Sequence, residues 1–134
     1  MRYKLFILLI LSTFNAWTTT HHPQAFLNEI SGEPDEGMKI VQHYCATCHA
    51  AKPMIQLGAP KIGDNNDWRP RIKLGLEHLV KHAEEGFNAM PARGGCFECS
   101  DEQFFLAILA MLPESERSAL LLELKQKSDQ KQSK

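Results

Sequence analysis

The sequence predicts an all-α fold built as one domain, and three observations carry that prediction. Apolar residues recur at helical spacing in several segments, loop-forming proline, glycine and asparagine residues gather between them, and no segment alternates apolar with polar residues as a strand would. A chain of 134 residues with a formal net charge of −1 suits a single small domain and argues against a nucleic-acid partner.

The first two helices are predicted from residues that are typical of helix N-termini. One begins near Pro34, and Gly37 within it indicates that another element crosses closely, because glycine costs about 1 kcal/mol relative to alanine inside a helix. A stretch with loop composition follows over residues 50–66. Asn66 or Asp67 can then cap the second helix.

Two further helices complete the predicted domain, which spans residues 34–112. The third has Leu76, Leu79, Val80 and Ala83 on one face, and Gly86 follows as its stop. The fourth begins after Ser100, which forms a capping-box pattern with Gln103, and Pro113 closes it.

The N-terminal segments are expected to lie outside the domain. Residues 1–20 have the pattern of a secretory signal, because two basic residues precede a short apolar run over residues 5–11. The predicted location is therefore the periplasm, and an uncleaved membrane anchor stays open as an alternative. The polar residues 21–33 are expected to form a flexible linker.

Residues 113–134 are expected to form an amphipathic C-terminal extension and tail. Phe105 and Leu109 make one side of the fourth helix apolar, and such a surface needs cover. One hypothesis is that the extension folds back over this side as an added helix, through Leu120, Leu121 and Leu124. The alternative is that the apolar side docks on a membrane protein.

The most informative motif is Cys-x-x-Cys-His, formed by Cys45, Cys48 and His49. This is the attachment sequence for c-type haem. Two thiols three positions apart lie about one helical turn from each other, within reach of the two vinyl groups of one porphyrin. The adjacent His49 would then ligate the iron.

Two other interpretations of the cysteines stay open. Cys96 and Cys99 form a second Cys-x-x-Cys pair, which with the first would suit a structural zinc site. Zinc ribbons usually separate their two pairs by roughly 15 to 20 residues, however, and Cys48 lies much further than that from Cys96. A thiol redox pair is the second alternative.

A second axial ligand is expected from a methionine, the ligand used where a high potential is required. Most of the methionines are poorly placed, because they lie in the signal, just after the attachment motif, or within predicted helices where core packing is the normal fate. These are Met1, Met54, Met38 and Met111. Met90 lies in a downstream loop, and the following Pro91 stiffens its backbone.

Three further runs of the sequence carry a family resemblance. They are Gly58-Ala59-Pro60-Lys61-Ile62-Gly63-Asp64, then Trp68 with Pro70 and Arg71, then Met90-Pro91-Ala92-Arg93-Gly94-Gly95-Cys96-Phe97-Glu98-Cys99-Ser100-Asp101. Together with the attachment motif, they resemble the cytochrome c5 family of small class I c-type cytochromes over residues 33–112. The resemblance implies the class I cytochrome c fold, with about four helices around one covalently bound haem.

The resemblance also implies roles for single residues around the haem. The iron would be ligated by His49 and Met90, and the backbone carbonyl of Pro60 would accept a hydrogen bond from the ligating imidazole. Trp68 and Arg71 would lie near the haem edge and its propionates.

For Cys96 and Cys99, the resemblance implies a small disulfide loop. Their position in a glycine-rich segment of an exported chain agrees with this, and the bond would constrain the loop that carries Met90. A catalytic dithiol is the alternative.

The function implied is that of a monohaem electron carrier and not of an enzyme. It would pass single electrons between respiratory donor and acceptor proteins in transient complexes. Two alternatives stay open: a haem enzyme or gas sensor with an open iron position, and a structural zinc module.

Overall fold

The computed structural model describes residues 22–132, with side chains described up to residue 126. This part of the chain is helical and contains no strand, only an isolated bridge between Phe87 and Met90. The helical elements are α1 (Pro23–Ile30), α2 (Glu36–Ile40), the π-helical segment η1 (Val41–Cys45), α3 (Ala46–His49), α4 (Asn65–Ile72), α5 (Leu76–Glu85), the short 3₁₀ segment η2 (Ala92–Gly95), α6 (Asp101–Met111) and α7 (Glu114–Gln132). The predicted all-α fold is confirmed, and the predicted signal lies outside the described residues.

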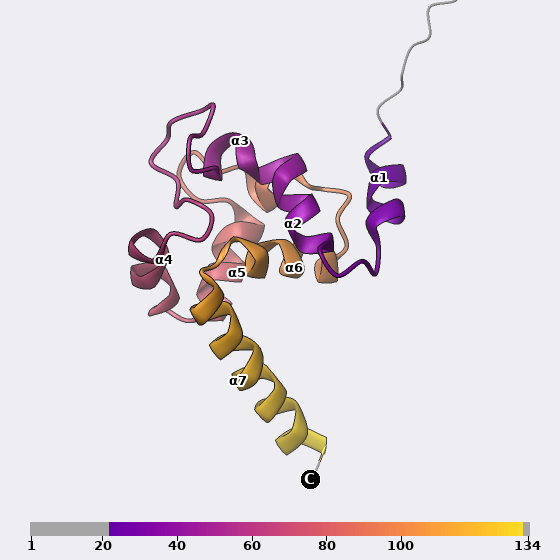
Figure 1. Ribbon diagram of the computed structural model, residues 1–134, viewed down its shortest axis with the longest axis vertical. Helices are drawn as coiled ribbons and strands as arrows, with labels where there is room; N and C mark the ends of the chain where they lie inside the picture. Colours follow the sequence, from indigo (N-terminus) through magenta and orange to yellow (C-terminus); the bar gives the residue numbers. More distant parts are fainter. Residues whose placement is uncertain (1–21, 133–134) are drawn as a thin grey trace, which may run out of the picture.

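The centre of the domain is the crossing of α2 and α6 (Figure 1). A Cβ atom added to Gly37 would lie 2.4 Å from the backbone oxygen of Leu106, closer than any real Cβ contact. Only glycine therefore lets the two backbones approach this far, and the predicted close crossing at Gly37 is confirmed. Core residues such as Ile40, Val41 and Ile108 are buried around it.

The start of α6 is fixed by the predicted capping box. The Ser100 side chain accepts from the backbone N–H of Gln103, and the Gln103 side chain accepts from the backbone N–H of Ser100. The Gln103 amide also donates to Glu36 Oε1 at 2.9 Å, while Glu36 Oε2 accepts from the backbone N–H of Gly32. These bonds satisfy the buried carboxylate of Glu36 and tie α2 to α6.

The N-cap of α4 is Asp64, whose side chain accepts from the backbone N–H groups of Asn66 and Asp67. The prediction that Asn66 or Asp67 caps this helix was therefore wrong. Several adjacent polar residues can cap a helix equally well, so the choice is made by tertiary contacts. Here Trp68 Nε1 donates to Lys61 O at 2.8 Å, which holds the first turn of α4 against the preceding loop.

Residues 23–30 form α1, so the prediction of a flexible linker was wrong for this segment. Leu27 is fully buried and Ile30 is nearly so, because this side of α1 packs on the core. The Gln103 amide also donates to Leu27 O at 3.1 Å. Burial against the domain stabilises a helix that would be too short to persist alone.

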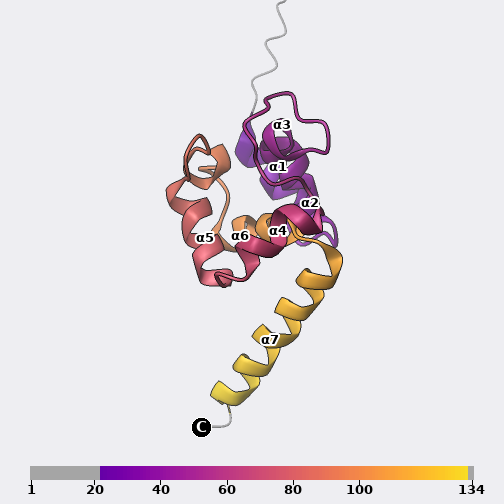
Figure 2. The ribbon, with the colours of Figure 1, turned by 90° about the vertical axis from the view of Figure 1, so that its left-hand side faces the viewer.

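Helix α7 leaves the body after Pro113 and projects away from the other helices (Figures 1 and 2). Leu120 packs against the core, but Leu121 and Leu122 are 47% and 62% exposed. The hypothesis that the extension folds back over α6 was therefore wrong. The physical reason is that Leu109 of α6 is already buried within the core and Phe105 packs against the same core, so the side of α6 that these two residues form does not need α7 as cover. Among the described residues, no helix is both long and apolar enough to cross a membrane.

Candidate haem site

The attachment motif lies at the end of one continuous helical stretch. Cys45 is the last residue of the π-helical segment η1, and Cys48 and His49 follow in α3. Single π-helical turns within α-helices often occur at functional sites. Both thiols are free and half-buried, so each is available for a bond to a ligand.

The orientation of His49 is fixed by a backbone carbonyl. His49 is only 7% exposed, and its Nδ1 lies 2.7 Å from Pro60 O. A carbonyl can only accept, so Nδ1 carries the proton and donates it. The lone pair is then on Nε2, which is the nitrogen left to bind a metal ion.

The loop over residues 50–64 brings Pro60 to the imidazole. Its position is set by a hydrogen bond from Ile62 N to His49 O at 2.8 Å, and by the bond from the Trp68 indole to Lys61 O. Trp68 is buried. Arg71 is half-buried, and its guanidinium donates a hydrogen bond to Asp67 O, one turn earlier in the same helix.

Met90 is held in a tight turn next to α5. Its backbone N–H donates to Phe87 O at 2.9 Å, and its carbonyl accepts from Phe87 N at 3.1 Å. Gly86, at φ +84°, lies directly beneath this turn, because a Cβ atom there would be 2.7 Å from Met90 O. The residue expected only to stop a helix therefore also makes room for the turn that carries Met90.

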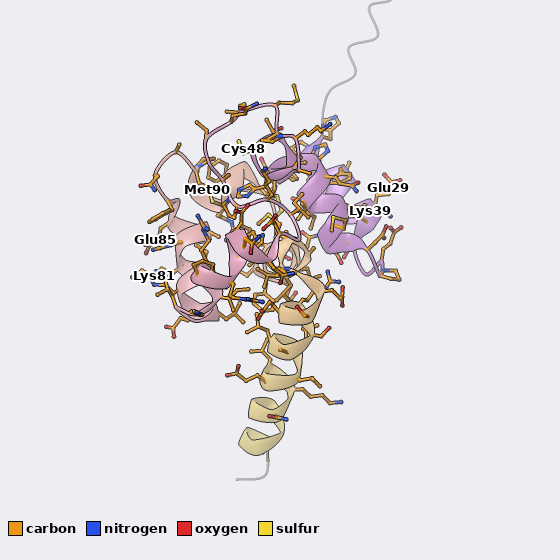
Figure 3. All side chains as sticks on the ribbon, turned by 60° about the vertical axis from the view of Figure 1, so that its left-hand side comes forward. Glu29, Lys39, Cys48, Lys81, Glu85 and Met90 are labelled. Atoms are coloured by element: carbon orange, nitrogen blue, oxygen red, sulfur yellow. A yellow bond between two sulfur atoms is a disulfide. The ribbon has the colours of Figure 1, made fainter. Side chains whose placement is uncertain are left out.

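Met90 and the attachment cysteines approach one another at Gly94. A Cβ atom added to Gly94 would lie 3.7 Å from the terminal methyl of Met90 and 4.0 Å from Cys45 Sγ. Met90 and Cys48 are labelled in the upper part of the domain in Figure 3. The loop from Met90 to Gly94 is thus folded onto the attachment motif, although the two lie far apart in the sequence.

Two of the other described methionines lie in surroundings unlike those of Met90, whereas Met38, like Met90, is partly buried against the core. Met54 is 88% exposed, Met111 is buried in the core, and Met38 packs against the core. Met90 is the downstream methionine whose methyl group lies beside Gly94, next to Cys45.

Arg93 is a residue that the sequence interpretation missed. Its guanidinium donates to Cys99 O at 2.8 Å and to Asp101 at 3.2 Å, and it lies over the Phe104 ring, 4.6 Å from the ring centroid. Its backbone is left-handed, with φ +54°. One side chain thus connects the Met90 loop to the start of α6, and the only signal in the sequence is an arginine next to two glycines.

Cys96 and Cys99 form a disulfide, with their Cα atoms 5.5 Å apart. Both residues are buried, with 2% and 5% exposure. The bridge closes the segment between the Met90 loop and α6, beside the carbonyl that Arg93 contacts.

The surroundings of the Cys45 thiol are poorly solvated. Burial raises the pKa of the Cys45 thiol to about 11, and the neighbouring Cys48 adds to the shift. Because desolvation penalises the thiolate, the shift indicates that the Cys45 sulfur is largely removed from water. Such surroundings suit contact with a hydrophobic porphyrin.

The residues present therefore fit a covalently attached haem. Two unbridged thiols lie on consecutive turns beside an imidazole with a fixed tautomer, and a glycine leaves space between Cys45 and the Met90 methyl. In the described residues no group of three or more histidine, cysteine or carboxylate side chains forms a metal cluster, so the two Cys-x-x-Cys pairs do not form one zinc site.

The comparisons agree with this geometry. A family model described as cytochrome c oxidase, cbb3-type, subunit III matches residues 32–105. Cytochrome c5 of Azotobacter vinelandii is 39% identical over 79 residues, which cover 58% of this chain and 92% of that protein. Cytochrome c5 of Ectopseudomonas mendocina is 42% identical over 74 residues, covering 54% and 82%. A cytochrome c crystallised in an electron-transfer complex with nitrite reductase superposes with a TM-score of 0.50 at 32% identity, over 57% of this chain and 89% of that one.

The family model matches more than half of the chain, and the alignments with two relatives near 40% identity cover 92% and 82% of those proteins. These matches establish the family. The helical architecture is accordingly the class I cytochrome c fold, and α7 lies outside the residues that the family model matches. The chain belongs to the cytochrome c5 family of electron-transfer cytochromes, which carry one covalently bound haem c.

Proposed function

We propose that the protein is a single-electron carrier whose iron is ligated on both sides, by His49 Nε2 and the Met90 sulfur. Cys45 and Cys48 would hold the haem through thioether bonds. The observation that carries the proposal is the approach of the Met90 methyl and Cys45 Sγ across Gly94, because it folds a thioether side chain onto the attachment motif.

The protein's own residues have three tasks in this proposal. His49 is held in one tautomer by Pro60 O, which also makes the imidazole a stronger donor to the iron. Burial excludes water from the site, which raises the reduction potential. Gly86 and Gly94 let the Met90 loop approach closely. The haem supplies the one-electron chemistry.

We place Trp68 and Arg71 near the haem edge and its propionates as part of the same proposal. The position proposed for Trp68 is supported by its hydrogen bond to Lys61 O, because Lys61 follows Pro60, whose carbonyl orients His49. Arg71 follows on the same helix, and its half-buried guanidinium is a donor that suits a carboxylate.

Electron-transfer partners are expected to bind briefly and over small interfaces. We propose that they are respiratory donor and acceptor proteins in the periplasm. Support comes from the pattern of a secretory signal and from the structural neighbour, which was crystallised with a redox enzyme. A retained N-terminal anchor would add contact with the membrane.

The main alternative is a haem enzyme or gas sensor, which needs an open iron position. Carbon monoxide distinguishes the two, because it binds ferrous iron only where a position is free or easily vacated. We expect the reduced holoprotein to bind carbon monoxide poorly at neutral pH. Tight, stoichiometric binding by the native protein would support the alternative.

Arg93 is expected to stabilise the Met90 loop. Replacing it with glutamine removes a charged donor shared by Cys99 O and Asp101, and should lower the free energy of unfolding by about 1.5 to 3 kcal/mol. Denaturant unfolding of the holoprotein measures the loss. The matched control is Arg69→Gln on the surface of α4, which should change stability by less than about 0.5 kcal/mol. Equal stabilities of the two variants would contradict this role.

The Cys96–Cys99 disulfide should contribute modestly to stability because it closes a very small ring. The chain-entropy relation gives about 2 kcal/mol for such a ring. A Cys96→Ala, Cys99→Ala double variant should unfold at a lower denaturant concentration while keeping its haem, which mass spectrometry detects. An unchanged unfolding midpoint would rule out this contribution.

A further inference from the structure

Helix α5 carries two histidines one turn apart, at positions 78 and 82. Their rings are in contact, with centroids 4.0 Å apart and planes tilted by 56°. Both side chains are half-buried. Lys81 and Glu85 of the same helix mark its outer surface at the edge of the domain (Figure 3). The pair lies on α5, whereas His49 lies in α3.

Neither ring has another role in the described part of the chain. No hydrogen bond or ion pair reaches a nitrogen of His78 or His82, and their only described contacts are between rings. His82 stacks on Phe87, with centroids 4.3 Å apart and planes 16° from parallel. This stacking limits the rotation of the His82 ring, so a ligand would meet a partly preorganised pair.

Two neutral imidazoles on neighbouring turns of a helix can bind one metal ion together, because residues four apart lie on the same face. We propose that His78 and His82 form a two-ligand site for one Cu²⁺, Ni²⁺ or Zn²⁺ ion. Imidazole nitrogen suits these ions, whereas Mg²⁺ and Ca²⁺ prefer oxygen ligands.

The net charge of helix α5 favours a cation. Helix α5 carries three carboxylates, Glu77, Glu84 and Glu85, against a single lysine, Lys81. Within residues 22–126, however, no third side chain joins the two histidines in a cluster of ligands. Water would therefore complete the coordination, and affinity should follow the intrinsic order of the ions, with Cu²⁺ tightest and Mn²⁺ weakest.

The test is a metal titration of the haem-loaded protein. A His21→Gln, His22→Gln background removes the adjacent histidines near the N-terminus, and thioether bonds would occupy Cys45 and Cys48. Isothermal titration with Cu²⁺, Ni²⁺ and Zn²⁺ is expected to show one ion per chain. Substoichiometric Cu²⁺ should broaden the ring resonances of His78 and His82 before any others.

Single variants locate the site. His78→Gln or His82→Gln should each weaken binding at least tenfold, since even the loss of outer partners of a metal ligand costs about 10- to 100-fold. His43→Gln is the matched control, and it should leave the affinity unchanged. An unaltered visible spectrum shows that each variant keeps its fold. Unchanged affinity in the His78→Gln, His82→Gln double variant, or no binding to the parent protein, would overturn the proposal.

Discussion

Replacing Met90 with alanine is expected to convert the closed iron site into an open one. The haem should stay attached through Cys45 and Cys48, because the thioether bonds do not involve Met90. With the sulfur ligand removed, the reduced protein should lose its low-spin visible spectrum and bind one carbon monoxide per haem. Visible spectroscopy with and without carbon monoxide measures both changes.

Met54→Ala is the matched control for this variant. Met54 is 88% exposed in the loop after the attachment motif, so its loss should leave the spectrum and the weak carbon monoxide binding as they are. If Met90→Ala behaves like the native protein, another residue ligates the iron and the ligand set proposed above is wrong.

Replacing Gly37 with alanine is expected to be the most destabilising small change in the helical core. Alanine normally favours a helix by about 1 kcal/mol over glycine, so propensity alone predicts a gain. The added Cβ would instead lie 2.4 Å from Leu106 O and 2.7 Å from Leu106 C, which forces α2 and α6 apart. We expect a net loss of about 3 kcal/mol, the upper end for over-packed cores, in denaturant unfolding.

A second variant separates a backbone clash from a side-chain clash. The two nearest atoms belong to the backbone of Leu106, so trimming its side chain cannot relieve them. Gly37→Ala combined with Leu106→Ala should therefore be no more stable than Gly37→Ala alone. Recovery of stability in the double variant, or a stabilising effect of Gly37→Ala, would contradict the close crossing of the two helices.

Local patterns predicted much of the fold. The capping box of Ser100 and Gln103 depends on two residues that are close in the sequence. The close crossing at Gly37 was predicted from a glycine inside a helix, where a residue without a side chain usually allows another backbone to approach. The attachment motif is of the same kind, since its spacing follows from the porphyrin it serves. Such features can be recognised from a few neighbouring residues, before the distant segment that they contact is known.

The errors in the predicted fold occur where distant contacts decide. The polar residues around this segment suggested a linker, although Phe26, Leu27 and Ile30 recur at helical spacing. The burial of Leu27 and Ile30 against the domain stabilises the helix that they form. The leucines of α7 predicted a helix correctly, but periodicity carries no information on the direction in which a helix leaves the body.

In the candidate site, too, the features that the sequence did not predict depend on contacts or backbone geometry. Arg93 connects Cys99 O, Asp101 and Phe104 through a left-handed backbone, a geometry that no residue spacing encodes. Gly86 was expected to end a helix, and its position beneath Met90 O depends on how the following turn folds back. Positions that adjust the Met90 loop are therefore visible only in the structure.

The most direct test of the account is the NMR spectrum of the reduced holoprotein with its methionine methyl groups labelled. A methyl group on a sulfur bound to the iron lies over the haem plane, where the ring current shifts its resonance far from those of other methionines. We predict that one methyl resonance is shifted in this way and that it disappears in Met90→Ala. A spectrum with no shifted methyl resonance, or a shifted one that survives in Met90→Ala, would contradict the ligation of the iron by His49 and Met90.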